Sequence, residues 1–578
     1  MTMIPGKDAP LEDSISRMRA CLEALGVDVD ESRWLNPVPG VWSVHIFDRN
    51  FPLLSANGKG ASRNAALASA LGDFCERLSS NYFFADYYLG QAIADDGFVH
   101  YPNERWFPVT DNGLPEGLLD EPTLLHYNMD GELKAAMLVD TNSGNRARGI
   151  CAIPFVRQNS GDQVWIPINI IRNLYLHNGI AAGNTVNEAR VKALSEIFER
   201  HIKNTIISSG ISLPDVPQWV QERYPATLGV IEALRSHGYV VLVKDASLGG
   251  KFPLVNVSLI NPADGGCFTS FGAHPKFEVA FERAVIELLQ GRELDSLEGF
   301  PLPRFDIAEV ADQDNLEAHF KDSGGAVAWD LFSTQTDYAF TEWNIEGDTQ
   351  AEFEELCHRI HKVDMDIYIA DFEHLGMYSC RIIVPGMSEV YPVDELVWNN
   401  NNAGIDLREP LLRMPELTDQ EVENLLLHLE DGGFDDQQRV VEILGILPDA
   451  DTVWNTLRVG ELKCLLNLRL GELEEALVWS EWMQQCASVV ADEDQAVLYR
   501  CLHQCLMFRL DDEHRLGHYR ALLDQIYGSE RVAQVLDMID GQSVFAGLTQ
   551  STLALEAFTQ HQHLLSVYAR VQQAKKGI

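Results

Sequence analysis

Residues 183–200 read Gly183-Asn-Thr-Val-Asn-Glu-Ala-Arg-Val-Lys-Ala-Leu-Ser-Glu-Ile-Phe-Glu-Arg200, and this stretch decides how the first two thirds of the chain fold. Thr185 and Glu188 have the spacing of a capping box, so we expect a helix that begins here, after a glycine-containing turn. Glu196 and Glu199 are three residues apart, which places them on one helix face. The free backbone N–H groups at such a helix start can bind an anion.

Two other stretches of the chain are related to this one. Residues 60–77 align with residues 183–200 without a gap. The matched positions are Gly60 with Gly183, Ser62 with Thr185, Asn64 with Asn187, Ala66 with Ala189, Ala70 with Ala193, Leu71 with Leu194, Asp73 with Glu196 and Glu76-Arg77 with Glu199-Arg200. A weaker third copy ends near residue 290. It matches Gly272 with Gly58, Ala280 with Ala66, Ala284 with Ala70, Glu287 with Asp73 and Gln290 with Glu76.

Each of these helices, taken alone, would be an ordinary solvated face with an acid near a base. Three related copies favour convergence instead, because each keeps carboxylates at one level of its helix. The converging acids would be Asp73, Glu76, Glu196, Glu199 and Glu287. They would repel one another unless divalent cations neutralised them, and Mg²⁺ prefers carboxylate oxygens and bridges them to phosphates. With Arg77, Arg200 and Arg283 available for the phosphates, the pattern predicts a Mg-nucleotide site without a Walker motif.

Composition narrows the classes of partner. Asp and Glu number 86 against 44 Lys and Arg, and the formal net charge is -42. This charge repels phosphate backbones and anionic membranes, so we expect no direct nucleic-acid binding and no membrane association. No run reaches the ~18 apolar residues of a membrane span, and no export signal is visible. The ten cysteines form no Cys-x-x-Cys pair, which favours reduced thiols and a cytoplasmic protein.

The chain divides into two parts of different character. Helical and strand patterns alternate irregularly over residues 1–405, which predicts an α+β domain. The polar residues 399–402 read as a linker or an extended loop, and residues 406–578 are almost wholly helical. Residues 460–482 resemble one unit of a tetratricopeptide repeat, although an irregular helical bundle fits the same pattern. The tryptophans of this part are expected in its core, namely Trp454, Trp479 and Trp482.

Taken together, several motifs make the sequence resemble the YcaO family over nearly its whole length. They are Ile4-Pro5-Gly6-Lys7-Asp8, residues 68–77, 182–190 and 195–200, Phe271-Gly272-Ala273-His274-Pro275, residues 287–292 and Arg381-Ile-Ile-Val-Pro385-Gly386-Met387. The resemblance implies an α+β domain in which acidic helices hold Mg²⁺ and ATP. Family members typically use ATP to phosphorylate a peptide-bond oxygen, so that a nearby nucleophile can attack the activated carbon.

Carried over position by position, the resemblance assigns two sets of residues. The implied Mg²⁺ ligands are Asp73, Glu76, Glu196, Glu199 and Glu287, and the implied nucleotide contacts are Lys7, Ser14, Asn184, Glu188, Arg200 and Arg283. No catalytic residue is assigned. His274 precedes the third acidic helix, where a structural role and acid–base work are both open.

Two departures from the family pattern bear on function. Asp73 stands where the family usually has Glu, which shortens the reach to one metal. The sequence ends Lys575-Lys576-Gly577-Ile578, without the proline-rich tail of azoline-forming members. The resemblance therefore points to members that assist the radical enzyme RimO.

We expect, on this resemblance, a homodimeric, Mg-ATP-hydrolysing accessory factor for β-methylthiolation of an aspartate on a small-subunit ribosomal protein. Its partners would be that ribosomal protein, RimO, or both. Two alternatives stay open. One is an ATP-dependent thioamidation or cyclodehydration enzyme, and the other is a non-catalytic scaffold.

Overall fold

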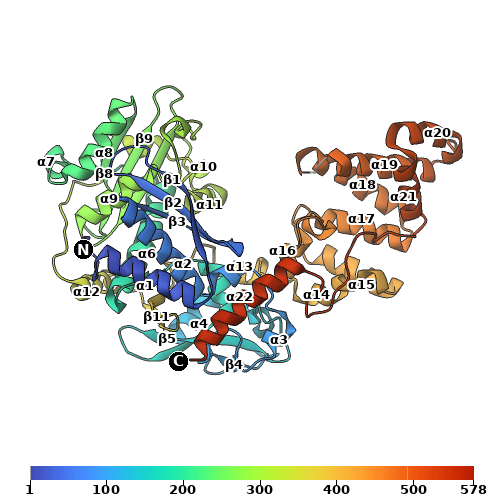
Figure 1. Ribbon diagram of the computed structural model, residues 1–578, viewed down its shortest axis with the longest axis horizontal. Coiled ribbons are helices and arrows are strands. Elements are labelled where there is room, and N and C mark those ends of the chain that lie inside the picture. The colour runs from blue at the N-terminus through green and yellow to red at the C-terminus, as the bar shows by residue number, and fades with distance from the viewer. Residues whose placement is uncertain (1, 491–492, 578) are drawn as a thin grey trace.

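The computed structural model describes residues 2–490 and 493–577, without the side chains of residues 487–490 (Figure 1). The last residue of the sequence, Ile578, lies outside this range. A mixed body of sheets and helices is followed by a group of helices to one side, and the final helix returns to the body. The helical second part predicted from the sequence is therefore present. Within the described ranges, no helix is both long and apolar enough to cross a membrane.

Three antiparallel sheets form the body, which confirms the α+β prediction. Their orders are β1-β2-β3, β10-β9-β8 and β4-β5-β11-β12-β7, and β6 pairs with β5. The strands are β1 Val29–Leu35, β2 Trp42–Asp48, β3 Phe51–Gly60, β4 Arg105–Phe107, β5 Ile150–Arg157, β6 Gln163–Pro167, β7 Ile180–Gly183, β8 Val240–Asp245, β9 Leu254–Ile260, β10 Cys267–Ala273, β11 Tyr368–Phe372 and β12 Tyr378–Ile383.

The helices of the body cover these sheets and connect them. They are α1 Leu11–Ala24, α2 Arg63–Ser79, α3 Gly90–Ala94, α4 Glu121–Tyr127, α5 Ile168–Ile170, α6 Val186–Ser209, α7 Gln218–Gln221, α8 Pro225–Ser236, α9 Phe277–Glu287, α10 Ile307–Val310, α11 Gln313–Lys321, α12 Thr349–His361 and α13 Glu395–Trp398. The three related sequence stretches are the strand–helix pairs β3–α2, β7–α6 and β10–α9. The alignment of the three stretches thus corresponds to three structural units.

The glycines of these units lie in the strands, so the prediction of a glycine-containing turn was wrong. Gly60 and Gly183 end their strands, and Gly272 lies inside β10. A Cβ atom at Gly272 would lie 2.2 Å from the carbonyl oxygen of Ala280, and one at Gly58 would lie 2.1 Å from the carbonyl oxygen of Ala66. Glycine is required because each helix returns directly onto its own strand, and the aligned glycines face aligned alanines.

The third acidic helix is shorter than the pattern suggested. Its spacing predicts a helix that includes Gln290, but α9 ends at Glu287. The backbone N–H groups of Leu289 and Gln290 then bond to carbonyls three residues back, which is the geometry of a tightened last turn. Gln290 is therefore not a member of the helix face on which Glu287 lies.

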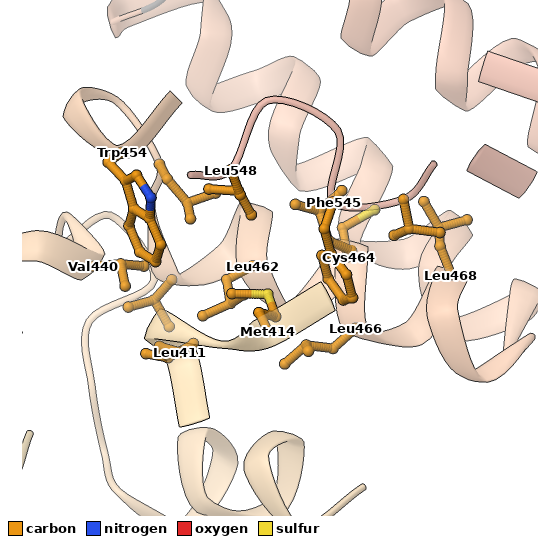
Figure 2. Close-up of a cluster of buried hydrophobic side chains, with 14 of the residues drawn as sticks. Leu411, Met414, Val440, Trp454, Leu462, Cys464, Leu466, Leu468, Phe545 and Leu548 are labelled. Atoms are coloured by element: carbon orange, nitrogen blue, oxygen red, sulfur yellow. The ribbon is translucent and has the colours of Figure 1, made fainter. Parts of the chain in front are cut away.

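The second part is built from helices around one apolar core. These helices are α14 Ile405–Leu412, α15 Asp419–Asp431, α16 Val440–Leu444, α17 Val459–Leu470, α18 Leu473–Val490, α19 Glu493–Leu510, α20 Leu516–Tyr527 and α21 Ser529–Ile539. Figure 2 shows Trp454 in this core near Val440 and Leu548, and its indole N–H donates to the carbonyl of Thr549. Trp454 is fully buried, whereas Trp479 and Trp482 are only partly buried.

The helix pair α17–α18 has the close crossing expected of the repeat-like stretch. A Cβ atom at Gly460 would lie 2.5 Å from the ring of Trp482, so the two helices approach through the glycine. Gly471 ends α17 in the left-handed conformation, with φ of 77°, and allows the chain to reverse. The relation to tetratricopeptide repeats stays a prediction.

Residues 399–402 form the loop that connects α13 to α14, and Asn400 and Asn402 fix this loop to the body by hydrogen bonds. Asn402 is buried, and its side-chain amide donates to three carbonyl oxygens between residues 136 and 139. Asn400 exchanges hydrogen bonds of 2.9 and 3.1 Å with Asn169. A run of amides looks exposed in a sequence because its polar groups need partners, and here the body supplies these partners.

The final helix, α22 Thr559–Lys575, packs along the body (Figure 1). Leu564, Val567 and Tyr568 belong to the core cluster that contains Phe74 and Phe84. The ring of Tyr568 meets that of Phe84 edge to face at 4.9 Å. Because the predicted second domain, residues 406–578, includes this helix, its packing ties the two parts together; the domain limits stay a prediction.

Candidate functional site

The three strand–helix units are connected in a ring through their acidic residues. Helix α2 contacts β7, α6 contacts β10, and α9 contacts β3. Glu76 on α2 accepts a hydrogen bond of 3.1 Å from the backbone N–H of Ala182, and Glu199 on α6 accepts one of 3.2 Å from that of Ala273. Glu287 on α9 closes the ring by pairing with Lys59 of β3. The aligned strand positions, Lys59, Ala182 and Ala273, thus each meet an acidic residue on the helix of another unit.

Every predicted metal ligand has a cationic partner in this arrangement. The ion pairs are Asp73–Arg77 at 3.0 Å, Glu76–Lys192 at 2.6 Å, Glu196–Arg200 at 2.8 Å, Glu199–Arg283 at 3.4 Å and Glu287–Lys59. In residues 2–490 and 493–577, no group of three or more His, Cys, Asp or Glu side chains is arranged to hold a metal ion. The carboxylates share one region, and lysine and arginine side chains neutralise it.

The electrostatics show that four of the carboxylates act on one another. Burial raises the pKa of Glu76 to about 7, the cation of Lys192 opposes this rise, and Asp73 adds to it. Burial also raises the pKa of Glu196, against the effect of Arg200, and Glu76 and Glu199 contribute to the rise. We call these four residues together with Glu287 the acidic site, a group of five.

The carboxylates of the acidic site also act on Lys59, a residue of the opposite charge. Burial lowers its pKa to about 7, and the carboxylates of Glu199, Glu196 and Asp73 oppose this effect. Carboxylates from three helices thus act on this one lysine, and carboxylate oxygens are the ligands that Mg²⁺ prefers. The donor chemistry of the acidic site therefore suits Mg²⁺.

Arg200 supplies a second argument for a bound Mg-nucleotide. One of its guanidinium nitrogens, Nη1, is buried without a hydrogen-bond partner, while Nη2 pairs with Glu196. The guanidinium lies over the ring of Phe320, 4.2 Å from the centroid. A buried cationic donor that lacks an acceptor is what a phosphate oxygen would satisfy. The residues present thus fit both halves of a Mg-nucleotide.

Four of the predicted nucleotide contacts lie together at the start of α6. Glu188 accepts from Lys7 Nζ at 3.2 Å and from the backbone N–H of Asp8 at 2.9 Å. Asn184 donates to Glu188 at 2.9 Å and accepts from the hydroxyl of Ser14 at 2.8 Å. These contacts bring Lys7, Ser14, Asn184 and Glu188 into one cluster, whereas Arg200 and Arg283 belong to the acidic site.

Only half of the predicted capping box forms at this helix start. Thr185 accepts from the N–H of Glu188 at 3.2 Å, as expected. The carboxylate of Glu188 does not return to the backbone of Thr185, because it is held by Lys7, Asp8 and Asn184. The N-terminal segment thus takes the place of the second half of the box and is fixed over the start of α6.

His274 packs against the same N-terminal segment. A Cβ atom at Gly6 would lie 2.7 Å from the imidazole, and the φ of 76° at Gly6 also requires glycine. Nδ1 of His274 accepts a hydrogen bond of 3.0 Å from the backbone N–H of Lys276. Burial lowers the imidazole pKa well below its usual range, with Arg283 and other cations adding to this effect. A neutral ring whose Nδ1 is an acceptor positions the turn before α9, which favours the structural role.

The sequence reasoning missed two residues of the site, Lys59 and Lys192. Lys192 lies four residues before Glu196 in the stretch that decides the fold, so it could have been found on the same helix face. Lys59 lies between the two aligned glycines of β3. A pattern defined by acidic residues alone includes neither lysine.

These features define a protein with a carboxylate- and arginine-lined site that suits a Mg-nucleotide and is built on three related strand–helix units. Residues 57–388 match the family described as YcaO cyclodehydratase, ATP- and Mg²⁺-binding. Residues 404–577 match the family described as YcaO cyclodehydratase C-terminal domain. The chain belongs to the YcaO family, as the motifs predicted.

The relatives cover the chain almost completely. The ribosomal protein S12 methylthiotransferase accessory factor YcaO of Escherichia coli (strain K12) is 50% identical over 577 residues, which span 99% of this chain and 98% of that protein. A Haemophilus influenzae protein carrying the name "Uncharacterized protein" is 49% identical over 579 residues, spanning 100% of this chain and 99% of its own length. A solved structure of YcaO from Methanopyrus kandleri bound with AMPPCP and Mg²⁺ is 18% identical, with a TM-score of 0.38, over 66% of this chain and 92% of that chain.

Proposed function

We propose that this protein is a Mg-ATP-binding and hydrolysing accessory factor for RimO-dependent β-methylthiolation of an aspartate on ribosomal protein S12. The observation that carries the nucleotide part is the ring in which the acids of α2, α6 and α9 meet the strands of neighbouring units. The pathway comes from the relative that is 50% identical over 577 residues and named an accessory factor of the S12 methylthiotransferase.

In this proposal Asp73, Glu76, Glu196, Glu199 and Glu287 hold Mg²⁺. Bound Mg²⁺ would neutralise charge on the phosphates and stabilise the transferring phosphoryl group. Arg200 and Arg283 would release carboxylates to the metal and bind phosphate oxygens in exchange. The cluster at the start of α6 would hold the nucleotide through Lys7, Ser14, Asn184 and Glu188.

The remaining parts of the proposal concern partners and location. The helices α14 to α21 would supply a surface for RimO, for ribosomal protein S12 or for a second copy of the chain in a homodimer. Their repeat-like pair α17–α18 is the kind of unit that builds protein-binding surfaces in helical repeats. A cytoplasmic location follows from the proposed ribosomal substrate.

Mass spectrometry of ribosomal protein S12 tests the pathway. In cells that lack the gene, a smaller fraction of S12 should carry the added mass of one methylthio group. The wild-type gene should restore this fraction. A gene encoding Glu199→Gln should fail to restore it, whereas Glu423→Gln, an exposed control on α15, should succeed. An S12 modification level independent of the gene contradicts the pathway.

The alternative functions predict different mass changes or a different ATP turnover. A cyclodehydration enzyme would leave a peptide short of one water mass, and a thioamidation enzyme would leave sulfur in place of one backbone oxygen. A non-catalytic scaffold would bind its partners but convert no ATP to ADP or AMP with the purified partners present. ATP turnover that is lost in Glu199→Gln would exclude the scaffold.

A further inference from the structure

A cavity is lined by residues of the body together with one residue of the final helix. Its volume is about 60 Å³, which gives room for several water molecules or for a small group of atoms. Arg172 and Arg381 line it together with Tyr82, Tyr101, Phe372 and Tyr568, the last of which comes from α22. We call it the arginine cavity.

Arg381 enters this cavity as a buried cation without a carboxylate partner. It lies on β12 and is 4% exposed. Nη2 donates to the carbonyl oxygen of Leu176 at 2.8 Å, but Nη1 is buried and has no hydrogen-bond partner. Among the residues that the structure describes, no Asp or Glu forms an ion pair with Arg381. Burial lowers its pKa to about 10, so the guanidinium remains charged at neutral pH.

The other charged groups around the cavity already have partners. Arg172 donates to Asp86 at 3.0 Å, and Asp86 is 85% exposed, so the cavity reaches the surface at this pair. His100 lines the cavity, and Asp140 accepts from it at 3.2 Å and also accepts from Ser143. Lys575 lies behind Tyr101 and donates to Asn81 and to the carbonyl of His100. Among the described residues that line the cavity, Arg381 is therefore the cation without an anionic partner.

We propose that the arginine cavity is a carboxylate-binding site in which Nη1 of Arg381 donates to the ligand. A buried guanidinium is costly without an anion, and its planar fork matches a carboxylate. The aromatic and aliphatic lining, which includes Ile153, Ile168 and Leu89, suits a carboxylate carried on a short carbon chain. The same lining disfavours a phosphate dianion, whose desolvation costs more.

The arginine cavity lies near residues of the proposed nucleotide site, but the proposal of carboxylate binding does not depend on the proposed function. Tyr82 lines the cavity, and its ring also lies 5.6 Å from the guanidinium carbon of Arg77 beside the acidic site. Two carboxylate sources fit this position: a free small carboxylic acid, or an acidic side chain of a protein.

Titration calorimetry on the full chain tests the site with four probes: acetate, the blocked amino acid N-acetyl-aspartate methylamide, inorganic phosphate and chloride at equal ionic strength. We expect saturable binding of acetate, of the blocked aspartate, or of both, and none of chloride. Binding of acetate alone would identify a free acid as the source, and stronger binding of the blocked aspartate would identify a side chain.

Two variants assign the binding to the cavity. Arg381→Met removes the donor, and Ile168→Phe fills the cavity but leaves Arg381 in place in case the first variant does not fold. Both should weaken carboxylate binding at least tenfold, whereas Arg223→Met at an exposed ion pair should not change it. Mg-ATP affinity should be unchanged in Ile168→Phe, which separates this site from the nucleotide site. Absence of saturable carboxylate binding, preference for phosphate, or equal binding in the folded variants would overturn the proposal.

Discussion

Glu199 connects two of the three helices by itself. Its carboxylate accepts from the backbone N–H of Ala273 and pairs with Arg283 on α9. Glutamine at this position keeps the shape and the acceptor oxygen but removes the charge that Mg²⁺ requires. We expect Glu199→Gln to weaken Mg-ATP binding roughly tenfold or more, since a bond to a charged group is worth about 1.5–3 kcal/mol.

The matched control for this prediction is Glu423→Gln on the exposed face of α15. Calorimetry should return the wild-type affinity for the control. Equal affinities of Glu199→Gln and the wild type would remove Glu199 from the set of metal ligands.

His561 gives a prediction for the dependence of stability on pH. Its Nδ1 accepts from the N–H of Leu447 at 2.9 Å, and Nε2 donates to the carbonyl of Tyr88 at 2.8 Å, which fixes a neutral ring. Burial lowers its pKa to about 4 from an ordinary value of 6.5. The unfolded chain therefore binds the proton first, and the stability that His561 contributes is present above pH 6.5 and is lost as the pH falls toward 4.

Glutamine offers a donor and an acceptor at this position but does not take up a proton, and it does not place them where the two imidazole nitrogens lie. We expect His561→Gln to be less stable than the wild type at pH 7.5 and to lose less stability than the wild type on acidification to pH 5. Thermal midpoints of both proteins at the two pH values measure this. A constant difference between the two proteins would show that His561 does not titrate on unfolding.

At the scale of elements, the strand glycines set how closely each acidic helix approaches its strand. A Cβ atom at Gly58 or Gly272 would meet a backbone carbonyl oxygen of α2 or α9 at 2.1 or 2.2 Å. We expect Gly58→Ala and Gly272→Ala each to destabilise the fold by about 1–3 kcal/mol or more, because the helix must move outward. Differential scanning calorimetry should show lower thermal midpoints.

Gly72 provides the control within the same helix. It lies inside α2, and a Cβ atom there would meet no atom within 4 Å. We expect Gly72→Ala to leave stability unchanged or to raise it by up to about 1 kcal/mol, since alanine favours the helix. If Gly58→Ala matched Gly72→Ala, the close approach of strand and helix would not constrain the fold.

Elements with a local cause could be predicted from the sequence. The cap at Thr185 follows from its near neighbours in the chain. The three related helices were also predictable, because the aligned copies carry an acid at one shared position, namely Asp73, Glu196 and Glu287; the roles of these acids as metal ligands stay a prediction. The pairing of Glu287 with Lys59 could not be predicted, since it depends on how α9 lies on β3.

At the scale of the whole molecule, α22 joins the end of the chain to the body. Its sequence has ordinary helical periodicity and gives no sign of which core it enters. Lys575, at its end, is fully buried against Asn81 and the ring of Tyr101. The asparagines of residues 399–402 are a second example, because their partners lie more than 200 residues away in the chain. Such long-range partners leave no trace in local patterns.

Tyr568 tests how strongly α22 stabilises the body. It is fully buried, packs on Phe84 and donates to the carbonyl of Val99. We expect Tyr568→Ala to cost about 3–5 kcal/mol, as for other large aromatic residues removed from a core. Ser566→Ala on the exposed side of the same helix should cost less than about 0.5 kcal/mol.

Thermal unfolding and limited proteolysis of these variants provide the measurement. In Tyr568→Ala, α22 should become a cleavage site while the apolar core around Trp454 stays protected. A variant with the wild-type midpoint and cleavage pattern would show that α22 contributes little to the body.

The central claim is that the helices α2, α6 and α9 hold one Mg-nucleotide between them. The most direct test is an experimental structure of the full chain with Mg²⁺ and a non-hydrolysable ATP analogue. We expect Mg²⁺ on carboxylates from all three helices, with Lys59 and Lys192 moved away from Glu287 and Glu76, and phosphates on Arg200 and Arg283. A nucleotide bound elsewhere, with the five ion pairs of the acidic site intact, would contradict the account.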